Sequence, residues 1–60
     1  MKNYNNLDLL TPKQVAEALQ LNIITVYSYI KTKQLVAVRL GRAYRITKED
    51  LNNFLKIHRT

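Results

Sequence analysis

Residues 11–33 of the chain have the sequence TPKQVAEALQLNIITVYSYIKTK, and this stretch decides the fold. Thr11, followed by Gln14 at the third position after it, forms a capping box that predicts a helix over residues 12–19. A second apolar helical period begins after Asn22, which is a good N-cap, and continues to the end of the stretch. Because only about three residues separate the two helices, we expect them to pack at a steep angle.

The second helix has an apolar side and a more polar side. Its inward stripe is expected to consist of Ile23, Val26, Tyr27 and Ile30. The opposite arc is expected to be exposed and consists of Ile24, Thr25, Ser28, Lys31 and Thr32. Tyr27 lies at the edge of the stripe, where its ring either packs into the core alone or packs while its hydroxyl reaches a phosphate. Tyr29 fits the core or the surface.

Over residues 36–46 the spacing of apolar residues changes from the helical period to alternation, with apolar and basic side chains taking turns on both sides of Gly41. This alternation predicts a β-hairpin. A three-residue loop would pair residues of like character: Leu40 with Tyr44, Val38 with Ile46, and Arg39 with Arg45. A two-residue loop would mix apolar and basic residues on both faces, so we expect the three-residue loop over residues 41–43. Tyr44 then belongs to the core.

A last helix is predicted after Thr47, which can cap it, with acidic residues in its first turn. Its inward stripe is expected to consist of Leu51, Phe54 and Leu55. Residues 1–8 carry no periodic pattern and are expected to form a flexible arm ahead of one folded domain over residues 9–60. The predicted architecture is mainly α with a small β-hairpin: helix, helix, two-stranded hairpin, helix.

Charge indicates the class of partner. Ten lysines and arginines stand against four acidic residues, which gives a formal net charge of +6. No acidic residue lies between Glu17 and Glu49, and the same span holds the cations Lys31, Lys33, Arg39, Arg42, Arg45 and Lys48. A basic surface without interleaved acids favours nucleic acid, because phosphate contacts release condensed counterions. Mixed signs would serve better for a merely solubilising surface.

The sequence offers no catalytic, metal or cofactor site. It has no cysteine, and His58 near the end of the last helix is its one histidine. A single glycine cannot form a glycine-rich phosphate loop. Glu49 and Asp50 are neighbours on a helix, where side chains diverge by about 100°, and helix capping accounts for them. We therefore expect a binding module, with no cofactor, that is not an enzyme.

Nothing in the sequence indicates a membrane protein. No stretch approaches the roughly 18 consecutive apolar residues of a membrane helix. The polar residues 1–6 lack the apolar core of a secretion signal. We expect a soluble, cytoplasmic protein without a membrane partner.

The run from Leu9 to Leu55 resembles the excisionase-like branch of the MerR-type winged helix-turn-helix family. The residues that carry the resemblance occur in the family's order: Leu10-Thr11, Val15-Ala16, Leu19, Asn22, Thr25-Val26-Tyr27, Ile30, Leu35, Ala37-Val38-Arg39-Leu40-Gly41-Arg42, Arg45-Ile46, Glu49-Asp50-Leu51 and Phe54-Leu55. The resemblance implies a winged helix-turn-helix domain, in which the hairpin is the wing, and double-stranded DNA as its partner.

The resemblance also implies which side chains meet the DNA. The second helix enters the major groove and presents Ile24, Thr25, Ser28, Lys31 and Thr32. The wing contacts the backbone or the adjacent minor groove through Arg39, Arg42 and Arg45, while Tyr27 and Lys13 hold phosphates. Members of this branch act at promoters as small regulators, or bend DNA at the attachment sites of mobile elements beside an integrase.

The chain departs from the family pattern in three places. The family usually has Gly after the second helix, where this chain has Lys33, and a left-handed cap there would be strained. It often has Pro where Val36 stands. It also usually has arginines where this chain has Ile23, Ile24 and Ser28, which shifts the expected contacts toward phosphates, thymine methyl groups and DNA shape.

Two further expectations concern partners. The printed chain ends at Thr60 without the long dimerising helix of full-length MerR regulators, so we expect a free monomer that binds DNA in several copies or beside a recombinase. The alternative from another class is an interaction module that docks on an integrase or a repressor. It predicts weak, non-specific DNA binding and functional apolar residues on the surface.

Overall fold

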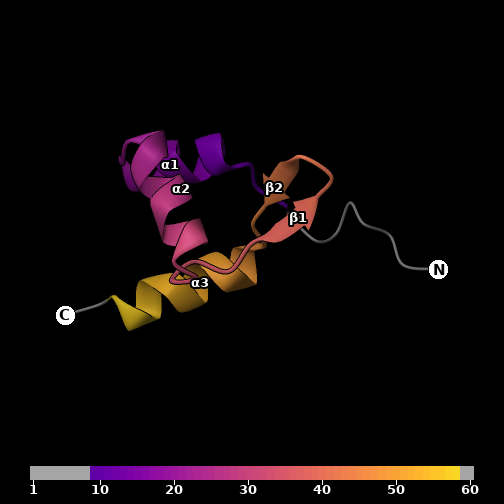
Figure 1. Cartoon of the computed structure of the whole chain (residues 1–60). Coiled ribbons are helices and arrows are strands. Elements are labelled where there is room, and N and C mark those ends of the chain that lie inside the picture. The colour runs from indigo at the N-terminus through magenta and orange to yellow at the C-terminus, as the bar shows by residue number, and fades with distance from the viewer. Residues whose placement is uncertain (1–8, 59–60) are drawn as a thin grey trace.

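The computed structural model describes residues 9–58, which form three helices and one two-stranded antiparallel sheet (Figure 1). The elements are α1 (Pro12–Leu19), α2 (Ile23–Lys31), β1 (Val38–Leu40), β2 (Ala43–Arg45) and α3 (Lys48–Ile57). This order confirms the predicted architecture of helix, helix, hairpin and helix. The arm expected over residues 1–8 lies outside the described residues.

All three helices begin at the caps that the sequence predicts. The Thr11 hydroxyl oxygen accepts a hydrogen bond from the Gln14 N–H (3.0 Å), and the Gln14 side chain accepts one from the Thr11 N–H (2.9 Å), which completes the capping box. The Asn22 side chain accepts from the N–H of Ile24 (2.8 Å). Thr47 caps α3 in the same way, through the N–H of Asp50 (3.0 Å). Each cap satisfies a backbone donor that the helix itself leaves without a partner.

Helices α1 and α2 both end on a residue with left-handed backbone that is not glycine. These residues are Gln20, with φ of 56°, and Lys33, with φ of 66°. In each case the next N–H bonds back across the last turn: Leu21 to the Ala16 carbonyl (2.8 Å) and Gln34 to the Tyr29 carbonyl (2.9 Å). This is the Schellman pattern, which usually has glycine at the left-handed position. Lys33 therefore has the left-handed backbone of the position where the family usually has Gly.

The core is small and continuous. Its buried residues come from the three helices, from the segment after α2 and from the residue after β2: Val15, Ala16, Val26, Ile30, Leu35, Ile46 and Phe54. Among the described residues no polar or charged side chain is buried. Apolar packing therefore supplies the main stabilisation, without help from a disulfide.

Three residues predicted to face the core are exposed instead. Ile23, Tyr27 and Leu55 each expose more than a third of their surface, so their assignment to inward stripes was wrong. On α2 the stripe turns toward Tyr29, whose ring meets that of Phe54 edge to face with centroids 5.1 Å apart. After α3, the ring of the exposed C-cap residue His58 lies against that of Phe54, with centroids 4.1 Å apart. Tyr29 is therefore a residue through which α2 contacts α3.

The hairpin register differs from the prediction. The paired residues are Val38 with Arg45, Arg39 with Tyr44, and Leu40 with Ala43, so the loop is the two residues Gly41 and Arg42. The predicted pairings, including Arg39 with Arg45, were wrong. Gly41 has φ of 64° and occupies the first central position of the turn, where a two-residue hairpin favours glycine. The alternation argument failed because it assumed a buried hairpin face, whereas every residue of β1 is exposed.

A backbone bridge that the sequence did not predict closes the fold. Leu10 and Ile46 form an isolated antiparallel pair in which each N–H donates to the other carbonyl at 2.8 Å. Leu10 precedes α1 and Ile46 follows β2, so the bridge joins the beginning of the domain to the base of the hairpin.

Two isoleucines of α2 test this description of the core. Ile30→Ala removes a buried side chain and leaves a cavity, and should lower the free energy of unfolding by about 2–4 kcal/mol. Ile24→Ala makes the same change on the same helix at a residue that is 74% exposed, and should cost less than about 0.5 kcal/mol. Urea unfolding followed by circular dichroism measures both, and equal losses would show that the buried face of α2 is assigned incorrectly.

Candidate nucleic-acid interface

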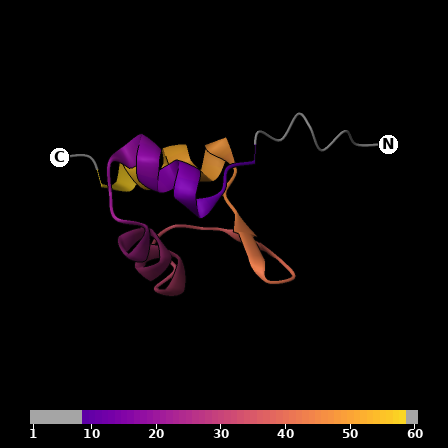
Figure 2. The ribbon, with the colours of Figure 1, turned by 90° about the horizontal axis from the view of Figure 1, so that it is seen from above.

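Helix α2 and the hairpin project from the rest of the domain toward one side. Figure 2, a view from above, shows α2 and the orange hairpin both extending to the same side of α1. Residues 32–37 link the end of α2 to β1. We call the hairpin, residues 38–45, the wing. A helix and a wing on one side of a domain can meet the same face of an extended ligand.

The outer face of α2 consists mainly of small or apolar side chains. Ile24 is 74% exposed, Ser28 and Lys31 are exposed beside it, and Thr25 is half-buried at the flank. Thr32 is exposed at the end of the helix, where its hydroxyl donates to a backbone carbonyl, that of Ser28 (3.0 Å) or that of Tyr29 (3.3 Å). The Thr32 hydroxyl is therefore less available to a ligand than the Ser28 hydroxyl.

The wing has two different faces because paired residues lie on the same side of a sheet. Arg39 and Tyr44 share the face turned toward α2, and the Arg39 guanidinium carbon lies 5.7 Å from the centre of the Tyr44 ring. Val38, Leu40 and Arg45 share the outer face. Arg42 is exposed in the turn. The three wing arginines expected to act together therefore point in different directions.

Two tyrosines connect α2 to the wing. The rings of Tyr27 and Tyr44 meet edge to face, with centroids 6.1 Å apart. Tyr44 also packs against the core, as expected, while Tyr27 is 39% exposed. Tyr27 is thus not a residue of the core alone, and its role as a phosphate ligand stays a prediction. Tyr29, which the sequence left open, packs against the core.

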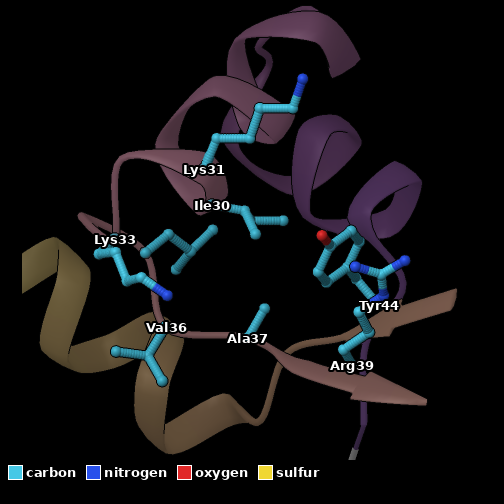
Figure 3. A pocket seen from close by; sticks show the side chains of 8 residues that line it. Ile30, Lys31, Lys33, Val36, Ala37, Arg39 and Tyr44 are labelled. Carbon is cyan, nitrogen blue, oxygen red and sulfur yellow. The ribbon is translucent and has the colours of Figure 1, made fainter. Parts of the chain in front are cut away.

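A hollow of about 480 Å³ lies between the end of α2, the linking segment and the wing. Its apolar part includes Ile30 and Leu35, and its basic part consists of Lys31, Lys33 and Arg39. We call this space the α2–wing hollow. Figure 3 shows the Lys33 side chain turned into it, with Arg39 and Tyr44 on the facing wall, whereas Lys31 extends away along α2. No acidic residue lines it.

Sequence reasoning placed Lys31, Arg39 and Tyr27 near this region but did not select Lys33 as a site residue. Lys33 could have been selected from its place after α2, where the end of the helix requires a left-handed φ and a lysine is therefore an unusual choice. Lys13, by contrast, is exposed on the first turn of α1 and does not line the hollow.

The described residues give no support to two other kinds of site. Within residues 9–58 no group of three or more His, Cys, Asp or Glu side chains could hold a metal ion. Glu49 and Asp50 lie in the first turn of α3, where they complement the helix dipole. No helix in this part of the chain is long and apolar enough to cross a membrane.

Comparison with known families identifies the fold that this geometry represents. The model of the helix-turn-helix domain family matches residues 9–59. The chain belongs to this family. Neither a curated protein nor a solved structure matched the chain in the same comparisons. The helix-turn-helix domain is a DNA-binding module, and here α1 and α2 form its two helices while the β1–β2 hairpin makes it a winged form.

The wing of this helix-turn-helix domain can be tested with two arginines in different settings. Arg39→Ala and Arg42→Ala should each weaken binding to two unrelated duplexes by similar factors, because phosphate contacts carry no base information. Only Arg39→Ala should also lower stability, by about 0.5–1 kcal/mol, because it loses the Tyr44 ring. Fluorescence anisotropy and thermal unfolding measure the two effects. A change in the preferred sequence on removing Arg42 would contradict a purely positioning role.

Proposed function

We propose that this helix-turn-helix domain binds duplex DNA sequence-specifically, with α2 in the major groove and the wing on the backbone beside it. One observation carries the proposal: α2 and the wing project to the same side (Figure 2), and the chain from α2 through the wing contains cations and no acid. In helix-turn-helix proteins the second helix of the motif is the one that contacts base edges. A major groove about 12 Å wide admits a single helix of this kind.

The proposed reading surface consists of Ile24, Thr25, Ser28, Lys31 and Thr32, with Arg39, Arg42, Arg45, Tyr27 and Lys13 holding the backbone. The side chains of this surface indicate which parts of the bases they can contact. Ile24 offers a methyl-rich surface suited to the C5-methyl group of thymine, and Ser28 can donate to or accept from either base of a pair. Without an arginine on this face, Lys31 is the side chain of the proposed reading surface that can donate to the O6 and N7 of guanine. Sequence-dependent DNA shape then carries more of the specificity.

For the biological role we propose an excisionase-like factor that bends DNA at the attachment sites of a mobile element, beside an integrase or recombinase. A small transcriptional regulator is the other role that the same DNA contacts would serve. The size of the domain supports assembly on DNA, since a single small module covers only a modest footprint. Several copies bound side by side, or one copy beside a larger protein, would supply the missing specificity. Neither role requires a cofactor.

The experiment proceeds in two steps. Selection from a pool of randomised duplexes defines the preferred site, if there is one, and a duplex of the same composition in scrambled order serves as the control. The selected site is then placed at different positions along a longer fragment, and gel mobility reports bending. A preferred site with strong bending supports the excisionase-like role, and a preferred site without bending supports the regulator.

A second candidate is an interaction module, and one observation favours it. Val36, Val38 and Leu40 expose about half of their surface on or beside the outer face of the wing. Such residues could contact an integrase or a repressor directly. Under this alternative the randomised pool yields no preferred duplex, and Leu40→Ser abolishes capture of the partner without changing DNA binding.

Salt dependence tests the electrostatic part of the proposal. If about five or six phosphates are contacted, log K should fall with log salt with a slope of roughly −4 to −5, because each neutralised phosphate contributes about 0.9. Anisotropy titrations over a series of KCl concentrations give this slope. Tight binding with a slope near zero would exclude the proposed backbone contacts.

Specificity tests α2 itself. Ile24→Ala and Ser28→Ala should each change the preferred sequence, with a loss of about 1–3 kcal/mol of discrimination where a good base contact disappears. Asn53→Ala, an exposed position on α3, is the matched control and should leave both affinity and preference unchanged. Circular dichroism should be the same for all three variants. If the α2 variants select the same sites as the parent, α2 is not the helix that reads the DNA.

A further inference from the structure

Lys33 occupies a position where its own backbone is strained. Its φ of 66° lies in the left-handed region, which glycine adopts freely and residues with a Cβ do not. Ending α2 requires only this backbone conformation, because the bonds that close the helix end are made by main-chain groups: Lys33 N–H to the Ile30 carbonyl (3.1 Å) and Gln34 N–H to the Tyr29 carbonyl (2.9 Å). A lysine is thus a costly choice for a cap, and local strain of this kind often marks a functional position.

The Lys33 side chain is directed at the α2–wing hollow. Figure 3 shows its ammonium group turned into this space, opposite Arg39 and Tyr44. The hollow joins these cations to an apolar wall that includes Ile30 and Leu35. A cationic rim beside apolar atoms suits a phosphodiester with its attached sugar better than a free inorganic anion, since only the former has carbon atoms to cover the wall.

Arg39 is already held in place on the opposite side of the hollow. Its Nε–H donates to the Gly41 carbonyl at 3.1 Å, and its guanidinium lies near the Tyr44 ring. Two contacts from one side chain reduce the freedom that a ligand would otherwise have to restrict. The terminal guanidinium nitrogens carry further N–H groups that can donate to a phosphate oxygen.

We propose that Lys33 and Arg39 clamp one phosphodiester of the DNA backbone in the α2–wing hollow, between the groove that α2 enters and the wing. The inference rests on the proposed function and deepens it by naming where a backbone phosphate sits and which residue binds it. The left-handed backbone of Lys33 lowers the stability of the free domain. In return, it places a cation where the DNA strand would pass from α2 to the wing.

The chain supplies a matched control, because Gln20 ends α1 with the same backbone conformation and does not line the hollow. Lys33→Gly and Gln20→Gly should each raise the melting temperature by roughly 3–6 °C, since both relieve the same strain. Only Lys33→Gly should weaken binding, by roughly three- to tenfold at about 0.1 M salt on every duplex, and reduce the salt slope by about 1. Lys33→Arg should restore the affinity and the slope.

Each other outcome is informative. If Lys33→Gly is more stable yet binds with unchanged affinity and slope, the clamp is wrong while the proposed function stands. If the parent protein binds no duplex from the randomised pool, the proposed function fails and the clamp fails with it. Should Lys33→Gly not fold, Lys33→Asn repeats the test, because asparagine also tolerates left-handed backbone and carries no charge. Parent-like binding by a folded Lys33→Asn would overturn the clamp.

Discussion

Two backbone hydrogen bonds between Leu10 and Ile46 fix the arrangement on which the rest of the domain depends. Leu10 immediately precedes the N-cap of α1, and Ile46, which is fully buried, separates β2 from the N-cap of α3. The bridge therefore holds the beginnings of two helices beside the base of the wing. A two-stranded hairpin is marginally stable on its own. Here its base is tied to the core, so the direction of the wing follows from the packing of the helices.

Tyr44 connects the core to the surface of the wing that faces α2. Its ring packs against the core, meets Tyr27 edge to face and lies beneath the Arg39 guanidinium, while its carbonyl accepts a hydrogen bond from Arg45 (2.7 Å). One side chain thus links the wing to the proposed reading helix. Because aromatic contacts of this kind depend on relative orientation, α2 and the wing are positioned as a unit. A ligand that spans both then meets a surface that is largely formed in advance.

The features that the sequence predicted correctly are local, and those it missed are not. Each N-cap, including that of Thr11, involves residues within one turn, so its chemistry is visible in the order of residues. The left-handed backbone at Lys33 was suggested only by the resemblance, because the family usually has Gly at that place. The hairpin register was predicted wrongly, because parity decides a register only where one face is buried, and β1 has no buried face. The Leu10–Ile46 bridge joins distant positions by backbone groups, which leave no trace in side-chain patterns. The proposed site residues came from charge and helix position, which selected Arg39 but not Lys33. The direction of the Lys33 side chain follows from the left-handed backbone after α2, which the order of residues does not show.

The chain has one glycine, and residues 9–58 contain three positions with left-handed backbone. It places the glycine in the wing, at Gly41, where a two-residue turn requires it most strictly. The ends of α1 and α2 are left to Gln20 and Lys33, at a cost in the stability of a domain whose apolar core contains seven buried residues within residues 9–58. Within the basic region, from α2 through the wing, neighbouring cations also repel one another. A polyanion that binds the folded form alone reduces this repulsion and shifts the folding equilibrium toward the native state. At Lys33, though not at Gln20, strain and charge therefore act together, because both lower the stability of the free domain at a place where a bound phosphate would offset the charge.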